Sequence, residues 1–201
     1  MPHPPTFTDR IRNLTHGILT PIAFTLVRWR VHPDAITLAG LLVVVVAAFC
    51  IANGDFALGG VLLVIGLPLD ALDGAVARAM QRRDNFGAVL DSTLDRYADG
   101  FIFIALSYYF ALHDQLDMML LALAALLGSL LVSYVRARAE GIDVTIKIGL
   151  FTRLERLLVI VLMLLIAPLL ELGVLILAIG TNITALQRLW YVSRVLNAES
   201  D

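Results

Sequence analysis

The sequence predicts an all-α integral membrane protein with six transmembrane helices, preceded by an N-terminal amphipathic helix at the membrane interface. Hydrophobic residues make up 59% of the 201 residues, charged residues make up 16%, and the mean hydropathy is +0.85. These values lie outside the range that is usual for soluble domains. The apolar residues also form six long runs separated by short polar turns, as expected for a chain that crosses a bilayer repeatedly.

Residues 1–32 form the first predicted segment. Its apolar side chains recur at helical spacing, at Phe7, Ile11, Leu14 and Ile18. Arginines at positions 10, 12, 28 and 30 flank these side chains. An apolar stripe with arginines beside it is typical of a helix that lies on a membrane surface, so we expect an interfacial helix here.

Residues 33–196 form the predicted membrane domain, and residues 197–201 a polar tail. The first apolar run, at 35–53, follows Pro33 and Asp34, which suit the first turn of a helix. The later runs are expected at 56–80, 86–112, 117–139 and 151–168, with a sixth that ends near residue 194. The longest internal polar loop is 141–149.

The distribution of basic residues predicts the orientation of these helices. All 15 lysines and arginines fall in the N-terminal segment, in 78–96, in 136–156 or in 188–194. The connections around 53, 114 and 170 contain none. The positive-inside rule therefore places both termini on the cytoplasmic side of the cell (inner) membrane.

Four aspartates interrupt the apolar pattern on that same side: Asp70, Asp73, Asp91 and Asp95. The spacings of three and four residues place each pair on one face of a helix. An aspartate at the centre of a membrane helix costs roughly 2.5 to 3.5 kcal/mol, so four would persist only in a polar, neutralised cavity. Carboxylates without histidine or cysteine suit Mg²⁺ or Mn²⁺. They could hold two metal ions, or one metal ion beside a free base.

The stretch 70–95 reads D-x2-D-G-x2-A-R-x8-G-x3-D-x3-D, which resembles the signature of the CDP-alcohol phosphotransferase (CDP-alcohol phosphatidyltransferase) family. The resemblance implies a six-helix homodimeric enzyme that transfers a phosphatidyl group from a CDP-linked lipid to an alcohol and releases CMP. It implies Mg²⁺ or Mn²⁺ as cofactor, and we expect two ions held by the four aspartates. Asp95 would also act as the general base.

The same resemblance implies a set of residues around the nucleotide. Small residues would let the backbone approach a bulky ligand, and an arginine would balance phosphate charge. The predicted CDP-binding residues are Asp34, Thr37, Asp73, Gly74, Ala77, Arg78 and Gly87. For Asp34, a role as a helix-start cap is an equal alternative.

A basic cluster predicts the acceptor. The arginines that we expect to bind an acceptor phosphate are Arg136, Arg138, Arg153, Arg156 and Arg188. The stretches 133–140 and 153–157 are similar to those of prokaryotic phosphatidylinositol-phosphate synthases, although Thr152 to Arg156 departs from their Glu-Arg-Pro-Glu-Arg pattern. The predicted substrates are therefore CDP-diacylglycerol and a polyol phosphate, inositol phosphate first.

Other functions remain as alternatives. Glycerol 3-phosphate or another alcohol could replace inositol phosphate, and an ether lipid could replace the diacyl donor. An ion-coupled transporter would also carry intramembrane acids, but it would show polar residues in several spans and an internal repeat. A nucleic-acid partner is not expected, because the arginines are dispersed over a membrane surface.

Overall fold

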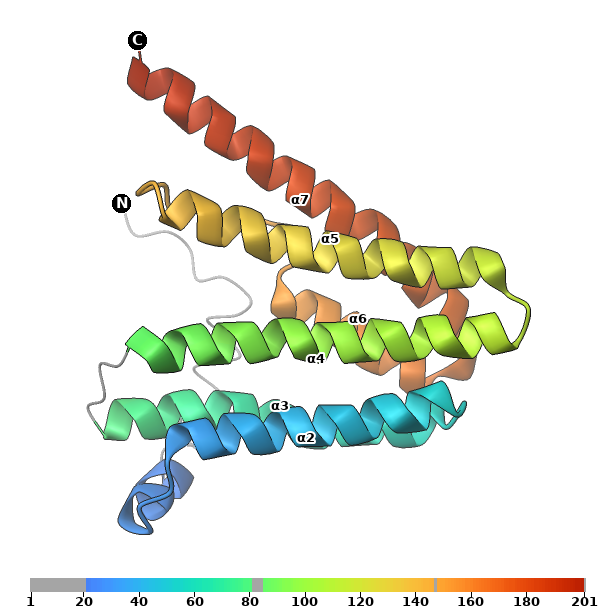
Figure 1. Cartoon of the computed structure of the whole chain (residues 1–201), viewed down its shortest axis with the longest axis horizontal. Helices are drawn as coiled ribbons and strands as arrows, with labels where there is room; N and C mark the ends of the chain where they lie inside the picture. The colour runs from blue at the N-terminus through green and yellow to red at the C-terminus, as the bar shows by residue number, and fades with distance from the viewer. Residues whose placement is uncertain (1–20, 81–84, 147, 201) are drawn as a thin grey trace. The chain divides into compact units, whose positions relative to one another are not determined.

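The computed structural model describes residues 21–80, 85–146 and 148–200, and at positions 67, 68, 70, 71, 199 and 200 it describes the backbone only. The described residues form helices joined by turns and contain no strand (Figure 1). In chain order the elements are α2 (Pro33–Ala52), α3 (Phe56–Ala79), α4 (Asn85–Leu112), α5 (Leu116–Glu140), α6 (Arg153–Leu165), the 3-10 turn η1 (Ala167–Leu169) and α7 (Leu170–Ser200).

Each of the six predicted apolar runs is a helix, which confirms the all-α class. The largest differences are at the end of the chain. Helix α7 begins directly after η1 and continues to Ser200, so residues 197–200 extend this helix instead of forming the expected tail. Residues 81–84, between the second and third of these helices, lie outside the described residues.

Three helical segments of the described chain are long and apolar enough to cross a membrane: α2, α5 and 167–198. This agrees with a membrane protein. Helix α6 has 13 residues, which at 1.5 Å per residue span about 20 Å, less than the ~30 Å hydrocarbon core of a bilayer. The expected number of six crossings therefore stays a prediction.

The chain divides into two compact units, which are described separately. The first unit comprises Met1–Val44 and Leu62–Ala98, and the second comprises Val45–Val61 and Asp99–Asp201. Helices α2, α3 and α4 contribute residues to both units.

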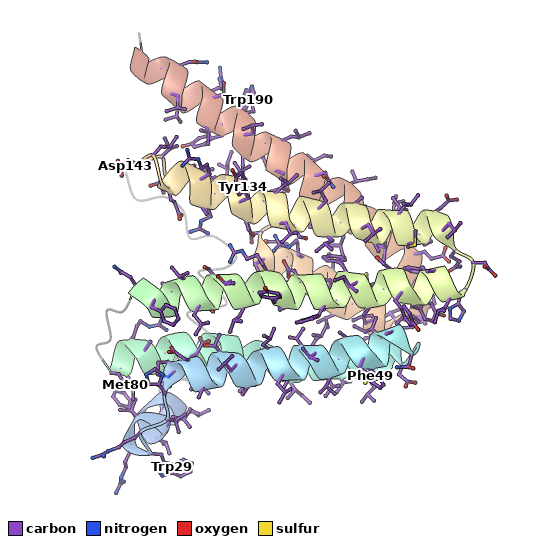
Figure 2. The ribbon with its side chains drawn as sticks, viewed as in Figure 1. Trp29, Phe49, Met80, Tyr134, Asp143 and Trp190 are labelled. Atoms are coloured by element: carbon purple, nitrogen blue, oxygen red, sulfur yellow. The ribbon has the colours of Figure 1, made fainter. Side chains whose placement is uncertain are left out.

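In the first unit, residues 21–28 are helical and pack on the beginning of α2 and the end of α3. The buried apolar side chains of this core are Ala23, Ile36, Leu72 and Val76. Trp29 is 72% exposed and points outward in Figure 2. The apolar stripe that predicted an interfacial helix lies within residues 1–20, outside the described part, so that helix stays a prediction.

Small side chains bring α2 and α3 together in the first unit. A Cβ atom at Gly40 would lie 3.7 Å from the Cβ of Leu69, and one at Gly66 would lie 3.5 Å from Val43. Both values are ordinary van der Waals distances. The close approach sets the start of α2 beside the part of α3 that carries the first two aspartates of the motif.

In the second unit, α5 and α7 lie side by side (Figure 1). A Cβ atom at Gly128 would lie 2.1 Å from the Thr181 hydroxyl oxygen, so only glycine fits at this crossing. The Asn182 amide donates hydrogen bonds to the carbonyl oxygen of Ala124 at 2.9 Å and to that of Ala178 at 2.8 Å. Polar side chains thereby join two largely apolar helices.

The segment that follows α5 packs back onto the same helices. Val144 and Ile146 are buried beside Ala139, and Tyr191 and Val195 of α7 pack against them. This apolar contact fixes the path of the segment toward α6, and it places Ile148 and Gly149 next to Arg188.

Candidate active site

The buried carboxylate of Asp73 lies at the centre of the described motif. Its residue is 6% exposed, and one oxygen accepts a hydrogen bond of 2.7 Å from the Thr37 hydroxyl. The other oxygen accepts a short hydrogen bond from the backbone N–H of Gly74. Hydrogen bonds to a carboxylate are stronger than those between neutral groups, so these two bonds fix the orientation of the Asp73 side chain.

The other predicted nucleotide-binding residues also lie in the first unit. A Cβ atom at Gly87 would lie 3.7 Å from a carboxylate oxygen of Asp34, and one at Gly74 would lie 3.4 Å from an Arg78 guanidinium nitrogen. Asp34 also lies 3.3 Å from the ring of His32. The seventh predicted residue, Ala77, is half-buried on the same helix. The beginnings of α2 and α4 therefore approach each other at Asp34 and Gly87.

The second pair of motif aspartates lies on α4. Asp91 and Asp95 are half-buried and four residues apart, so they share one face of the helix. The Asp95 carboxylate lies 3.9 Å from the guanidinium of its neighbour Arg96. Of Asp70 only the backbone is described, and the described side chains include no cluster of three potential metal ligands. The convergence of all four aspartates stays a prediction.

The chemistry of these donors fits the expected metal. Asp73, Asp91 and Asp95 offer carboxylate oxygens at positions that are at least partly shielded from solvent. Hard divalent cations such as Mg²⁺ and Mn²⁺ bind such oxygens in preference to nitrogen or sulfur ligands. Without a bound cation, the negative charges of these aspartates would be costly in a largely apolar protein.

The second unit holds an ion pair that the sequence analysis did not foresee. Arg156 of α6 is 3% exposed, and its Nη2 lies 2.7 Å from a carboxylate oxygen of Asp99 on α4. The Nε of the same arginine is buried and has no hydrogen-bond partner among the described residues. A signal for Asp99 was present, because it extends the four-residue spacing of Asp91 and Asp95 into an apolar stretch.

Arg188 is the second buried arginine of the predicted acceptor set, at 5% exposure. Its Nε donates to the carbonyl of Ile148 at 3.0 Å, and its Nη1 donates to the carbonyl of Val132 at 2.8 Å. These bonds fix the guanidinium without neutralising it. The positive charges of Arg136 and Arg156 act on it, and the negative charge of Glu140 offsets them in part. The two positive charges are the larger effects, so the surroundings of Arg188 suit an anion.

A glycine allows the segment before α6 to approach Arg188. Gly149 has a φ of +155°, and a Cβ atom there would lie 3.0 Å from Nη2 of Arg188. The backbone N–H of Phe151 then donates to the Thr184 hydroxyl at 3.0 Å. Sequence reasoning named Arg188 but missed Ile148, whose carbonyl oxygen accepts a hydrogen bond from it, and Gly149, which leaves room for the guanidinium.

The remaining arginines of the acceptor set differ in their surroundings. Arg136 is exposed and forms an ion pair of 2.9 Å with Glu140, one helical turn away. Arg138 is also exposed, whereas Arg153 is half-buried at the first position of α6. The structure thus buries only Arg156 and Arg188 of the five.

The model of the CDP-alcohol phosphatidyltransferase family matches residues 30–186, which include every motif aspartate and the first four acceptor arginines. The chain belongs to the CDP-alcohol phosphatidyltransferase family. The resemblance read from the motif is thereby confirmed, and the protein is an enzyme of phospholipid biosynthesis.

Two curated relatives of this phosphatidyltransferase carry specific names. The phosphatidylinositol phosphate synthase of Cutibacterium acnes is 39% identical over 144 residues, which cover 71% of this chain and 70% of the relative. The archaetidylinositol phosphate synthase of Methanothermobacter thermautotrophicus is 39% identical over 152 residues, which cover 76% of this chain and 74% of the relative.

Solved structures of the phosphatidylinositol phosphate synthase of Mycobacterium tuberculosis are also similar. The structure with CDP-DAG bound has a TM-score of 0.83 at 33% identity, covering 88% of this chain and 94% of that one. The complex with manganese and citrate has a TM-score of 0.81 at 34% identity, covering 87% of this chain and 88% of that one.

Proposed function

We propose that this enzyme transfers a phosphatidyl group from CDP-diacylglycerol to a hydroxyl group of inositol phosphate, giving phosphatidylinositol phosphate and CMP. The observation that carries the proposal is the buried Arg188 guanidinium, which donates hydrogen bonds to two backbone carbonyl oxygens and is not paired with a carboxylate among the described residues. The charges of Arg136 and Arg156 also act on it and outweigh that of Glu140. Such a site favours an anionic acceptor over free inositol or serine. The names of the similar proteins support inositol phosphate as that acceptor.

On the donor side, we assign the nucleotide to the residues around Asp73. Arg78 balances the charge of the diphosphate, and Gly74, Ala77 and Gly87 leave room for it. Thr37 holds the Asp73 carboxylate in place at 2.7 Å. Asp34 lies beside Gly87 and is assigned to the cytidine end.

Two ions of Mg²⁺ or Mn²⁺ are assigned to Asp70, Asp73, Asp91 and Asp95, consistent with the manganese complex of the Mycobacterium tuberculosis enzyme. Bound metal would neutralise the diphosphate and the charge that develops on the leaving CMP. Asp95 is assigned a second role, as the base that takes the proton from the attacking hydroxyl of the acceptor. This removes the positive charge that would otherwise build on the attacking oxygen.

On the acceptor side, Arg188 and Arg156 are assigned to the phosphate of inositol phosphate, with Arg136, Arg138 and Arg153 around them. Guanidinium groups bind phosphate oxygens through paired N–H donors, which fixes orientation as well as affinity. We assign the whole domain, 33–196, to six membrane crossings in a homodimer. The site and both termini are assigned to the cytoplasmic side, because the basic residues gather there.

A second candidate donor is a CDP-linked ether lipid, because one relative is named archaetidylinositol phosphate synthase. A second candidate acceptor is glycerol 3-phosphate, which also carries a phosphate for Arg188. Both alternatives leave the assigned roles of the aspartates unchanged.

The proposal is tested by CMP release from purified protein, with the lipid product identified by mass. Diacyl and ether CDP-lipids are each offered with inositol phosphate, glycerol 3-phosphate, free inositol or serine. We expect product from CDP-diacylglycerol and inositol phosphate, lost on chelation and restored by Mg²⁺ or Mn²⁺. Product only with free inositol or serine would contradict the assignment of the arginines. Full activity after chelation would contradict the assignment of the aspartates.

A further inference from the structure

The ion pair between Asp99 and Arg156 joins α4 to α6 inside the second unit. We propose that Asp99 is a positioning residue for the acceptor: it fixes the Arg156 guanidinium so that its remaining donors bind the acceptor's phosphate. This inference rests on the proposed function, because it assumes a phosphorylated acceptor. The inference goes beyond the proposed function because it gives a role to an aspartate outside the family motif.

The hydrogen-bonding state of Arg156 supports this role. Asp99 takes the Nη2 donor at 2.7 Å, whereas the buried Nε has no partner among the described residues. A buried N–H without a partner has lost its hydrogen bonds to water and gained none in return, so it calls for a ligand that would accept it. The planar guanidinium has rigid geometry, and a bond at Nη2 therefore also sets the direction of the Nε–H.

The charges around the pair point to an anionic ligand. Arg188 is buried and bonded to neutral carbonyl oxygens, and the charge of Arg156 acts on it. Two guanidinium groups are buried in this unit, and Asp99 is the carboxylate bonded to one of them. Glu140 also acts on Arg188, but it is exposed and forms an ion pair with Arg136. The excess positive charge suits one further anion, as a phosphate monoester would supply.

Loss of the Asp99 charge has two opposing effects on phosphate binding. The field would become more positive, which alone would strengthen the binding of an anion. Arg156 would also lose the partner that compensates its burial, and a buried charge left alone tends to move toward water. If positioning dominates, the variant binds the acceptor more weakly. If Asp99 only reduces the local charge, the variant binds it more strongly.

The test compares the full-length enzyme with Asp99→Asn, which keeps the shape of the side chain and removes its charge. We expect the KM for inositol phosphate to rise at least about tenfold, and the KM for CDP-diacylglycerol to stay within about twofold. Asp99→Glu, which restores the charge, is expected to recover part of the loss. The matched control is Asp143→Asn, at an exposed position beyond the end of α5 (Figure 2), and it should leave both constants unchanged.

A double-mutant cycle separates positioning from a general structural role. Because Asp99 is proposed to act through Arg156, Asp99→Asn should add little to the KM of Arg156→Gln. Independent, additive effects of the two substitutions would overturn the inference. A lower melting temperature with an unchanged acceptor KM would also overturn it, since that result describes a purely structural ion pair. If Asp99→Asn abolishes turnover, the affinity of the variant for inositol phosphate is measured by calorimetry instead. A weaker affinity than that of the wild type supports the inference, and an equal affinity overturns it.

The panel of acceptors distinguishes failure of this inference from failure of the proposed function. If the wild-type enzyme uses glycerol 3-phosphate, the acceptor is reassigned, and the inference holds when Asp99→Asn raises the KM for that phosphate instead. If the enzyme uses only an acceptor without phosphate, the inference falls together with the proposed function. Unchanged phosphate binding in Asp99→Asn overturns the inference alone.

Discussion

The hydroxyl of Thr37 donates a hydrogen bond of 2.7 Å to the carboxylate of Asp73, which lies 36 residues further along the chain. This bond joins the first turns of α2 to the motif on α3. It fixes the orientation of the Asp73 carboxylate, which is buried. A threonine outside the motif therefore helps to determine the geometry of an aspartate inside it.

Thr37→Val should lower kcat/KM for CDP-diacylglycerol about tenfold or more. The substitution preserves the volume of the side chain and removes its donor, and hydrogen bonds to charged groups contribute about 1.5–3 kcal/mol. The assay is CMP release at saturating acceptor. Thr25→Val is the control, because its hydroxyl donates to the backbone carbonyl of Pro21 at an exposed position and not to a carboxylate. Equal losses in the two variants would show that the bond to Asp73 has no special role.

Asp95→Asn should abolish turnover while metal-dependent binding of CDP largely survives. The amide cannot take the proton from the acceptor hydroxyl, but its oxygen can still serve as a weak ligand. Turnover is followed by CMP release, and binding by calorimetry with CDP and Mg²⁺. Near-normal turnover in this variant would refute the assignment of Asp95 as the base.

Arg188→Lys should raise the KM for inositol phosphate at least about tenfold, with little change in the KM for CDP-diacylglycerol. Lysine keeps the charge but cannot reproduce the planar set of donors that bonds to Ile148 and Val132. Arg194→Lys is the control on the same helix, since Arg194 is exposed and stacks over Trp190 at 4.7 Å. A rise in both KM values would instead indicate a general disturbance of the fold.

Gly149→Ala should also weaken the binding of inositol phosphate, although it changes no charged residue. The new Cβ atom would lie 3.0 Å from Nη2 of Arg188 at a backbone φ of +155°, so the guanidinium or the segment before α6 must shift. The measured quantity is again the KM for inositol phosphate. Gly141→Ala is the control, because its φ is −70° and the nearest atom to a Cβ there would be 3.4 Å away. An unchanged KM in Gly149→Ala would mean that the position of Arg188 does not depend on this approach.

The sequence predicted the helices well for a simple physical reason. Long apolar runs bounded by polar turns have few alternatives to membrane helices, so the six segments emerged with ends close to those observed. The motif was equally informative, because residues such as Asp73 and Gly74 are close in the chain and share one helix.

The pairing of Asp99 with Arg156 could not be predicted in the same way. The two residues are 57 positions apart, and the contact depends on how α4 packs against α6. The burial of Arg188 was also hidden, because α7 is apolar on nearly all sides and its pattern does not indicate an inward face. Such contacts depend on tertiary packing rather than on local spacing.

The central claim is that buried arginines select a phosphorylated acceptor, and the most direct test is a comparison of two acceptors that differ only by that phosphate. CMP release from CDP-diacylglycerol would be measured over a range of inositol phosphate and of free inositol with the wild-type enzyme. We predict that kcat/KM is at least about a hundredfold higher for inositol phosphate, as two charge-assisted contacts of about 1.5–3 kcal/mol each would give. Equal values, or a preference for free inositol, would contradict the account.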